Sequence, residues 1–297
     1  MAISKTANPT NEISADVYQK FKTFNELCDL PLDLRISTIT MTCKLDTDFL
    51  LENIGRYISL SPDRIVAVKY GSDPNCNRSL IEKKSRSKKN KKKKRTFFNQ
   101  ATVIIKARDG KTINLKLFLN GSIQMTGCKN LRGCIDVLDI LCNELKIIKG
   151  VLEVTPEYKI IPKVLVTDSD AVDISKIKNI LIRMINSGFY IGFEINREKL
   201  YEILLRENID CIFEPIVHAC VNIKYNYKNL ERISIFVFET GNIIITGAKT
   251  KDQIIEAYKF ITKKIYKNYN KIVINNLDKL IEEDSIKQIL AESNISI

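Results

Sequence analysis

Hydrophobic and polar residues alternate along two stretches of this chain. From Ile113 to Leu119 every second residue is apolar, and the same alternation runs from Ile233 to Val237. Because successive side chains of a strand point to opposite faces, each stretch predicts a strand with one buried face. Gly121 and Gly241 follow where a hairpin turn requires a positive φ. Each stretch therefore begins a predicted strand–turn–strand unit.

A helical period follows each predicted hairpin. In the second unit, Thr250 and Gln253 have the spacing of a capping box, which predicts where that helix begins. Apolar residues then recur every three or four positions, as on the buried side of a helix. These stripes consist of Cys134, Ile135, Leu138, Leu141 and Leu145 in the first helix and of Ile254, Ile255, Tyr258, Ile261 and Ile265 in the second.

The two units are copies of one sequence. Residues 113–145 align without a gap with residues 233–265, and eight of the 33 positions are identical. The offset of 120 residues is too long for a solenoid repeat and indicates one duplication. Upstream of each hairpin the pattern predicts a further strand and a helical segment. These are residues 35–42 with 46–59 in the first copy, and 179–185 with 197–207 in the second.

The duplication divides the chain into five segments. The linker contains two prolines and the polar run Thr167-Asp168-Ser169-Asp170, and both terminal extensions are expected to be partly helical. The first copy carries a Lys-rich insertion at about 72–96, which reads as exposed because it has no apolar period. The segments are an N-terminal extension (1–33), the first copy (34–147), a linker (148–176), the second copy (177–268) and a C-terminal extension (269–297).

Positive charge is concentrated in the insertion. The chain carries a net charge of +12, yet ten of the thirteen residues from Lys83 to Arg95 are Lys or Arg. Without them, 37 basic residues face 35 acidic ones, so the remainder is nearly neutral. Three interpretations of the tract stay open: a nuclear-localisation signal, a phosphate-binding arm or a solvated loop. The phosphate-binding candidates in it are Lys88, Lys89, Lys91, Lys92, Lys93 and Lys94.

Several classes of function are disfavoured. The chain has eight cysteines, one histidine and no C-x-x-C pair, so we expect reduced thiols and neither zinc nor another cofactor. It lacks a secretory signal and an 18-residue apolar run, so neither secretion nor a membrane span is expected. No nucleophile elbow, P-loop or H-E-x-x-H motif occurs, which argues against an enzyme. His218 is expected in a strand in a structural role, and Asp168 and Asp170 in a polar linker rather than at a metal.

The duplicated T-G-A/C-K motif, with a phenylalanine upstream in both copies, resembles the TATA-box-binding protein family. The second copy matches over Phe238–Lys249, and the first over Thr38–Asp46, Ser61–Arg64 and Phe118–Lys129. The resemblance, which spans residues 34–266, implies an α+β fold. In that fold two quasi-symmetric repeats form one curved, saddle-shaped antiparallel sheet with helices on its convex face.

The family resemblance also implies a function. A member would act as a transcription initiation factor that binds A·T-rich promoter DNA through the minor groove and bends it by wedging phenylalanines between base steps. Its partners would be a transcription factor IIB-like protein, other initiation factors and the RNA polymerase machinery. The acidic pair expected to dock transcription factor IIB is replaced by Ile209 and Cys211, with Glu207, Asp210 and Glu214 as substitutes nearby.

The family roles carry over unevenly to individual residues. The wedge positions match Phe118, Phe213 and Phe238, and we prefer Phe98 to Ile65 for the fourth. Leu34 stands where the first copy should have the groove-contacting asparagine, and Gln124 replaces an apolar residue. Ser122 and Asn242 stand where basic residues are expected, so Arg108, Lys129 and Lys249 remain as phosphate candidates. The other groove candidates are Ile36, Thr126, Asn179, Leu181, Ile244 and Thr246.

Two other functions remain open: a protein-interaction module with this fold that has lost specific DNA binding, and an accessory domain of a nucleic-acid enzyme. Exposed phenylalanines on the face without helices would favour DNA kinking, whereas a face covered by the terminal segments would favour an interaction module. The abundance of Ile, Lys and Asn indicates an A·T-rich genome, as in a protist or a large DNA virus. The expected location is accordingly the nucleus or, for a viral protein, a cytoplasmic virus factory or the virion.

Overall fold

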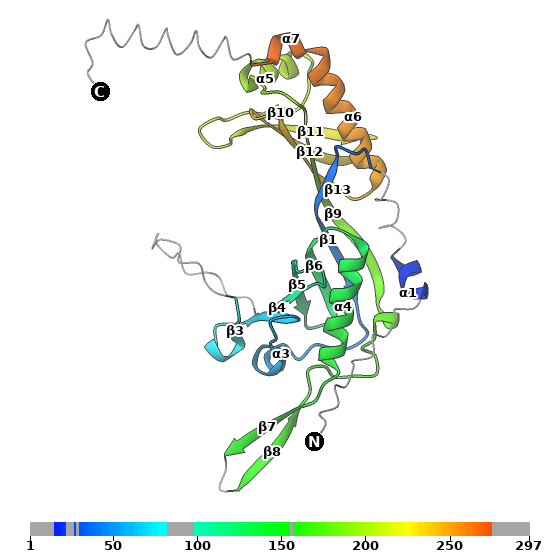
Figure 1. The fold of residues 1–297 in the computed structure, drawn as a ribbon, viewed down its shortest axis with the longest axis vertical. Helices are drawn as coiled ribbons and strands as arrows, with labels where there is room; N and C mark the ends of the chain where they lie inside the picture. The colour runs from blue at the N-terminus through cyan, green and yellow to red at the C-terminus, as the bar shows by residue number, and fades with distance from the viewer. Residues whose placement is uncertain (1–14, 22–26, 28–29, 82–97, 155–156, 275–297) are drawn as a thin grey trace, which may run out of the picture. The chain divides into compact units, whose positions relative to one another are not determined.

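A computed structural model describes residues 15–21, 27, 30–81, 98–154 and 157–274 (Figure 1). The chain divides into two compact units. Among the described residues, the first unit contains 15–21, 27 and 40–182, and the second contains 30–39 and 183–274. Strands β1 (Arg35–Lys44) and β9 (Lys178–Tyr190) each pass from one unit into the other, so the elements of each unit are described separately below.

In the first unit, the strands follow the hydrogen-bonded order β1-β6-β5-β4-β2-β3. They are β2 (Ile65–Tyr70), β3 (Asn77–Ser79), β4 (Gln100–Lys106), β5 (Thr112–Phe118) and β6 (Ser122–Cys128). Helix α4 (Leu131–Leu145) lies along one face of this sheet (Figure 1), and its predicted stripe is buried. The unit also contains α1 (Ala15–Lys20), α3 (Leu51–Tyr57), η2 (Pro74–Cys76) and η3 (Ile174–Lys176).

In the second unit, antiparallel strands follow the order β10-β11-β12-β13-β9. Helix α6 (Lys251–Lys267) packs against them and begins with the predicted capping box of Thr250 and Gln253. Ile243 and Ile245 are buried on the helix side, whereas Ile244 is on the other face, as the alternation of side chains along a strand requires. The remaining elements are α5 (Arg197–Arg206), β10 (Cys211–Ile212), β11 (Cys220–Tyr227), β12 (Glu231–Phe238), β13 (Asn242–Ala248) and α7 (Tyr269–Ile272).

The two hairpin glycines have the predicted backbone conformation. Gly121 has a φ of 78° and Gly241 a φ of 79°. A side chain at either would also overlap backbone oxygens of a neighbouring loop, that of Leu45 at Gly121 and that of Phe193 at Gly241. Glycine is therefore required at each turn for two reasons: the positive φ, and the close approach of the neighbouring backbone.

The linker contains a hairpin that the sequence pattern did not predict. Strands β7 (Lys149–Val154) and β8 (Tyr158–Lys163) form a separate two-stranded sheet. Lys149 Nζ at its base donates to Glu144 Oε1 at 2.7 Å and to Ser59 Oγ at 2.7 Å. Burial raises the pKa of Glu144, but the hydrogen bonds from Lys149 and Ser59 outweigh it, and the pKa is lowered. One face of the hairpin exposes Leu152, Val154, Tyr158 and Ile160.

These observations confirm the α+β class with antiparallel strands and correct several details. The helix expected within 46–59 is shorter, covering Leu51–Tyr57. His218 precedes β11 and lies in an exposed loop, so its prediction as a strand residue was wrong. Seven of the eight cysteines lie in the described chain, and all seven are buried, free thiols. None of the described helices is long and apolar enough to cross a bilayer.

Candidate nucleic-acid interface

Each sheet has one face against a helix and one face without such cover. In the second unit, Ile233, Ile235 and Val237 of β12 are fully buried toward α6, so Ser234, Phe236 and Phe238 point the other way. We call this the second-unit open face, formed by Asn186, Asn222, Lys224, Ser234, Phe236, Phe238, Ile244 and Thr246.

The strand register places apolar side chains at the centre of the second-unit open face. Phe236 lies opposite Ile244, which in turn lies opposite Gly188. Glycine has no side chain, so nothing from β9 covers Ile244 at that position, and Ile244 is 38% exposed. The centre is thus an apolar surface without helix cover, which requires a functional explanation.

Four polar side chains of the second-unit open face form two hydrogen-bonded pairs. Lys224 Nζ donates to Ser234 Oγ at 2.7 Å. The Thr246 hydroxyl donates to Asn186 Oδ1 and lies 3.7 Å from the sulfur of Met184. These internal bonds leave the apolar side chains as the most available groups on this surface.

The first-unit open face has a different character. It includes residues of β4, β5 and β6 that alternate with buried ones: Gln100, Thr102, Ile104, Asn114, Lys116, Phe118, Gln124 and Thr126. The register pairs Lys116 with Gln124 and Asn114 with Thr126. These four side chains form no hydrogen bond with any other described residue. Their donors and acceptors are therefore available to a ligand.

The two open faces occupy equivalent positions in the duplication. At the offset of 120 residues, the Phe236–Ile244 pair corresponds to Lys116–Gln124, and Ser234–Thr246 corresponds to Asn114–Thr126. Because each copy leaves the equivalent sheet face uncovered, each copy carries a candidate binding surface.

A mimivirus protein shows which family this duplication belongs to. The chain is 36% identical to the "TATA-box-binding protein-like" protein of Acanthamoeba polyphaga mimivirus over 279 residues, which cover 88% of this chain and 73% of that protein. The chain belongs to the TATA-binding protein family. Members of the family are non-enzymatic DNA-binding factors, which agrees with the prediction that this chain is not an enzyme.

Two further similarities involve the TATA-binding protein family. Residues 176–268, the second copy, match the family described as transcription factor TFIID, or TATA-binding protein (TBP). The structure is similar to that of Methanococcus jannaschii TBP with a TM-score of 0.48 and 17% identity, covering 79% of this chain and 99% of the archaeal one.

The four wedge candidates expected of a TATA-binding protein lie in different environments. Phe118 and Phe238 lie half-exposed on the two open faces. Phe98 precedes β4 and is 66% exposed, and its carbonyl accepts a hydrogen bond from the Tyr70 hydroxyl at 3.3 Å. Phe213 is different, because its ring packs 5.9 Å from that of Tyr201 on α5 with the Arg197 guanidinium 5.5 Å from its centre. Phe213 is half-buried beside α5, so we do not include it among the proposed wedges.

The other groove candidates divide by exposure. Thr126, Asn179 and Leu181 are exposed, whereas Ile36 is half-buried. Asn179 has a φ of 54°, a left-handed conformation that asparagine tolerates better than most residues. Leu34 is only 4% exposed, so its side chain is not available for contact and we exclude it.

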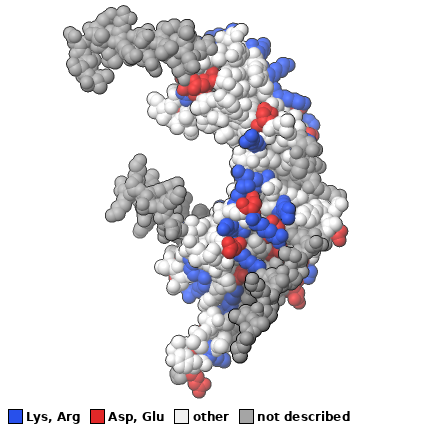
Figure 2. Space-filling model, viewed as in Figure 1, with Lys and Arg blue, Asp and Glu red and all other residues white. Residues whose placement is uncertain are grey.

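The phosphate candidates are largely engaged in ion pairs. Arg108 lies 3.6 Å from the buried carboxylate of Asp136, and Lys249 lies 2.9 Å from Glu231. Lys129 is exposed and forms no ion pair with another described residue. Basic and acidic side chains are intermixed on the face shown in Figure 2. The six lysines of the Lys-rich tract lie outside the described residues.

The acidic substitutes for the family's factor-docking pair are also mostly engaged. Glu207 accepts from Lys264 and lies 3.4 Å from Lys267, and Asp210 pairs with Arg232. The hydrogen bond and charge of Lys264 lower the pKa of Glu207. Glu214 is exposed in the loop before β11, so it is the substitute most accessible to a partner.

Most members of the two open faces were not among the candidate site residues from the sequence. Strand parity places Lys116 and Phe236 on these faces, but the family resemblance gave neither of them a role. Asn222 lies opposite Phe236, and its Oδ1 is buried without a hydrogen-bond partner among the described residues. No sequence signal marked Asn222, because it follows no motif.

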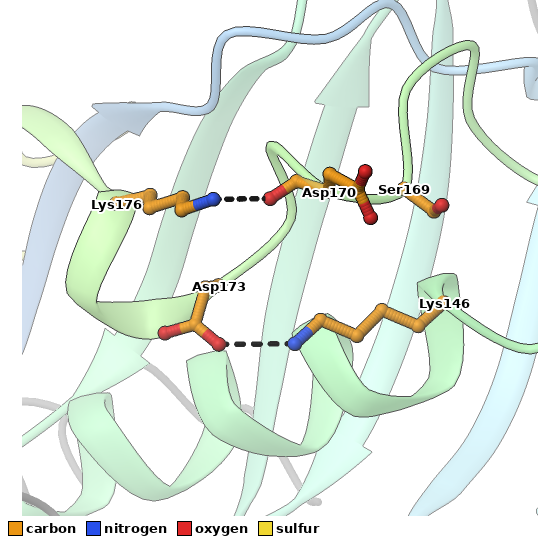
Figure 3. Close-up of a pocket in the computed structure, with 5 residues that line it drawn as sticks. All are labelled: Lys146, Ser169, Asp170, Asp173 and Lys176. Atoms are coloured by element: carbon orange, nitrogen blue, oxygen red, sulfur yellow. Dashed lines mark hydrogen bonds and ion pairs between the residues drawn. The ribbon is translucent and has the colours of Figure 1, made fainter.

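A polar pocket lies elsewhere in the first unit (Figure 3). Lys146 Nζ donates to Asp173 Oδ2 at 3.0 Å, and Lys176 Nζ donates to the carbonyl oxygen of Asp170 at 2.6 Å. Asp168 Oδ1 accepts from the backbone nitrogen of Asp170 at 2.9 Å, which explains the polar run as turn structure. The described residues include no group of three or more His, Cys, Asp or Glu side chains placed to hold a metal.

Proposed function

We propose that this TATA-binding protein family member binds A·T-rich promoter DNA through the minor groove and bends it to begin transcription. The observation that carries the proposal is the uncovered apolar centre of the second-unit open face, Phe236 and Ile244, with Phe238 beside it. In the minor groove an A·T pair presents only acceptors, so apolar groups lie against it without burying a donor.

Phe238 and Phe118 are the proposed wedges. A wedge between base steps unstacks them at a cost of a few kcal/mol, which the wider contact of the bent duplex offsets. Each of these rings precedes a hairpin turn fixed by glycine, Gly241 or Gly121, so its position is set by a rigid element. Thr246 is a proposed groove contact on the second-unit open face, and Thr126 is its counterpart in the first copy. Asn179 and Leu181, which are exposed on β9, are further proposed groove contacts.

The test is a bending measurement with a fluorophore at each end of an A·T-rich duplex. Wild type is expected to shorten the end-to-end distance, and Phe238→Ala to reduce both bending and affinity, by about tenfold or more. Tyr158→Ala is the matched control, since it removes an exposed aromatic ring from the β7–β8 hairpin. Equal affinity of the two variants for DNA, or an unbent bound duplex, would contradict the proposal.

The family also suggests protein partners. We propose that a transcription factor IIB-like protein, other initiation factors and the RNA polymerase machinery bind this chain on promoter DNA. Exposed Glu214 is the acidic residue best placed to contribute. We propose that the protein is located where its promoter DNA is. That place is the nucleus or, for a viral protein, the cytoplasmic virus factory or the virion.

A second candidate function is that of a protein-interaction module. It is favoured by the β7–β8 hairpin, whose exposed face carries Leu152, Val154, Tyr158 and Ile160. Large exposed apolar patches often mark interaction sites. Failure of the wild-type chain to bind any A·T-rich duplex would favour this function.

A further inference from the structure

The first-unit open face differs from the second at its central pair. Where the second unit has Phe236 opposite Ile244, the first has Lys116 opposite Gln124. Both central pairs point away from a helix-covered core made of the intervening residues, such as Leu115 and Ile235. The difference is therefore confined to the surface that would meet DNA.

The Gln124 side chain is available for recognition. It is half-exposed, and its amide forms no hydrogen bond with another described residue. In the second unit Ile244 stands at the equivalent position. The polar side chains on that face are paired, Lys224 with Ser234 and Thr246 with Asn186, and the Asn222 Oδ1 is buried. An amide offers an acceptor and a donor side by side, whereas the Lys116 ammonium opposite is only a donor.

Minor-groove chemistry distinguishes the two central pairs. A·T and T·A pairs present acceptors only, while a G·C pair adds the exocyclic amino donor of guanine. Gln124 Oε1 can accept from that amino group while its Nε2 donates to guanine N3. Against an A·T pair the bases offer the same Oε1 no donor, so it gains nothing from them on burial. Ile244 has the opposite preference, because it would bury guanine's amino group without an acceptor.

We infer that Gln124 makes the first copy select a half-site containing a G·C pair, so that the full site is A·T-rich in one half only. This inference rests on the proposed minor-groove function and extends it to base specificity. Lys116 supports either sequence, since its ammonium donates to the acceptors of both kinds of pair. A site with two unlike halves would also fix the direction in which the protein sits on DNA.

The test replaces each base pair of a bound duplex in turn with G·C and with inosine·C. Inosine lacks only the exocyclic amino group, so the comparison isolates the donor that Gln124 would read. Wild type is expected to bind G·C about tenfold more tightly than inosine·C at one position or more in one half of the site. Gln124→Ile should bring that ratio to about one or invert it. Ile244→Gln, the reciprocal variant, should create a similar preference in the other half.

The outcomes separate this inference from the function on which it rests. Wild type that binds and bends A·T-rich DNA but never prefers G·C to inosine·C overturns the inference and leaves the proposed function intact. The same holds if Gln124→Ile keeps the wild-type preference. A wild-type chain that binds none of the duplexes overturns both. Because the wild-type scan needs no variant, a folding defect in Gln124→Ile does not prevent a decision.

Discussion

In the second unit, Phe236 and Ile244 form the centre of the open face, whereas Lys116 and Gln124 occupy the same positions in the first. On the opposite face the two units agree, since Leu115 and Ile235 are both fully buried against a helix. Interior packing tolerates little change in volume or polarity, while an uncovered face has no such constraint. Duplicated units can therefore keep one fold and diverge in what they bind.

The turns show the same conservation as the core. Gly121 and Gly241 have nearly equal φ values of 78° and 79°, and each lies against the backbone of the loop that follows the first strand of its unit. The helix caps differ in residue type but not in role, because the side chains of Asn130 and Thr250 both accept a hydrogen bond from a backbone nitrogen in the first turn of α4 and α6. The scaffold is thus symmetric even where the surface is not.

The largest expected effect separates the two faces of one strand. Leu115→Ala should lower the free energy of unfolding by about 2–5 kcal/mol because it leaves a cavity under α4. Lys116→Ala, one residue further, should change it by about 0.5 kcal/mol or less because the side chain is not in the core. Chemical denaturation of both variants measures the difference.

The second unit supplies the replicate for this comparison. Ile235→Ala should be as costly as Leu115→Ala, and Phe236→Ala should cost less than half as much. Similar losses at Lys116 and Leu115 would mean that the first-unit open face is covered in the folded protein. The contrast between the two faces would then be wrong.

A smaller loss is expected at the hairpin turns. Gly241→Ala should destabilise the protein by about 2–3 kcal/mol, because a positive φ is strained for alanine and the new methyl group overlaps the Phe193 oxygen. Gly121→Ala should behave alike in the first unit. Gly110 is the matched control, since its φ is 81° but no atom lies within 4 Å of an added Cβ. Its alanine variant should cost only the torsional strain, about 1–2 kcal/mol.

Thermal unfolding of the three glycine variants tests whether both turns are equally constrained. If Gly110→Ala is as destabilising as Gly241→Ala, then strain alone accounts for the requirement. A large loss at Gly241 with none at Gly121 would instead show that the scaffold symmetry does not extend to stability.

Strand parity made much of the fold predictable from the sequence. Alternation placed the buried residues of β5 and β12, and the Thr250–Gln253 spacing located the start of α6. These patterns are local and are repeated, so each copy supports the other. The β7–β8 hairpin was missed because Gly150 and Pro162 interrupt its pattern, and proline in a run normally argues against a strand.

The site was less predictable because it depends on contacts between distant residues. Alignment placed Phe213 among the wedges, but its ring is held by Tyr201 and Arg197 of α5. Leu34 matched a groove position, yet tertiary packing buries it. Local sequence patterns do not predict whether the side chain of a loop residue packs against a helix.

The smallest expected effect on stability concerns the C-terminal ends of α4 and α6. In both units lysine–carboxylate ion pairs lie at these ends. Lys146, which follows α4, lies 3.0 Å from Asp173, and Lys264 and Lys267 of α6 pair with Glu207. Hydrogen bonds from Ser175, and then from Lys146, lower the pKa of Asp173 to about 2. In an unfolded chain the pKa of aspartate is about 3.9. The stability from this carboxylate is therefore present above pH 4 and lost as the pH falls from 4 to 2.

Asp173→Asn tests this pH dependence in the first unit. The variant should lose about 1 kcal/mol at pH 7, a value reduced from the full pKa shift because the pair is partly exposed and screened. Between pH 4 and 2 the free energy of unfolding of wild type should fall by about 1 kcal/mol more than that of the variant, because only wild type has the carboxylate to lose. Glu207→Gln should alter the acid limb in the same direction, because the pKa of Glu207 is also lowered. Parallel curves for wild type and Asp173→Asn would show that Asp173 adds no stability through its bonds to Ser175 and Lys146.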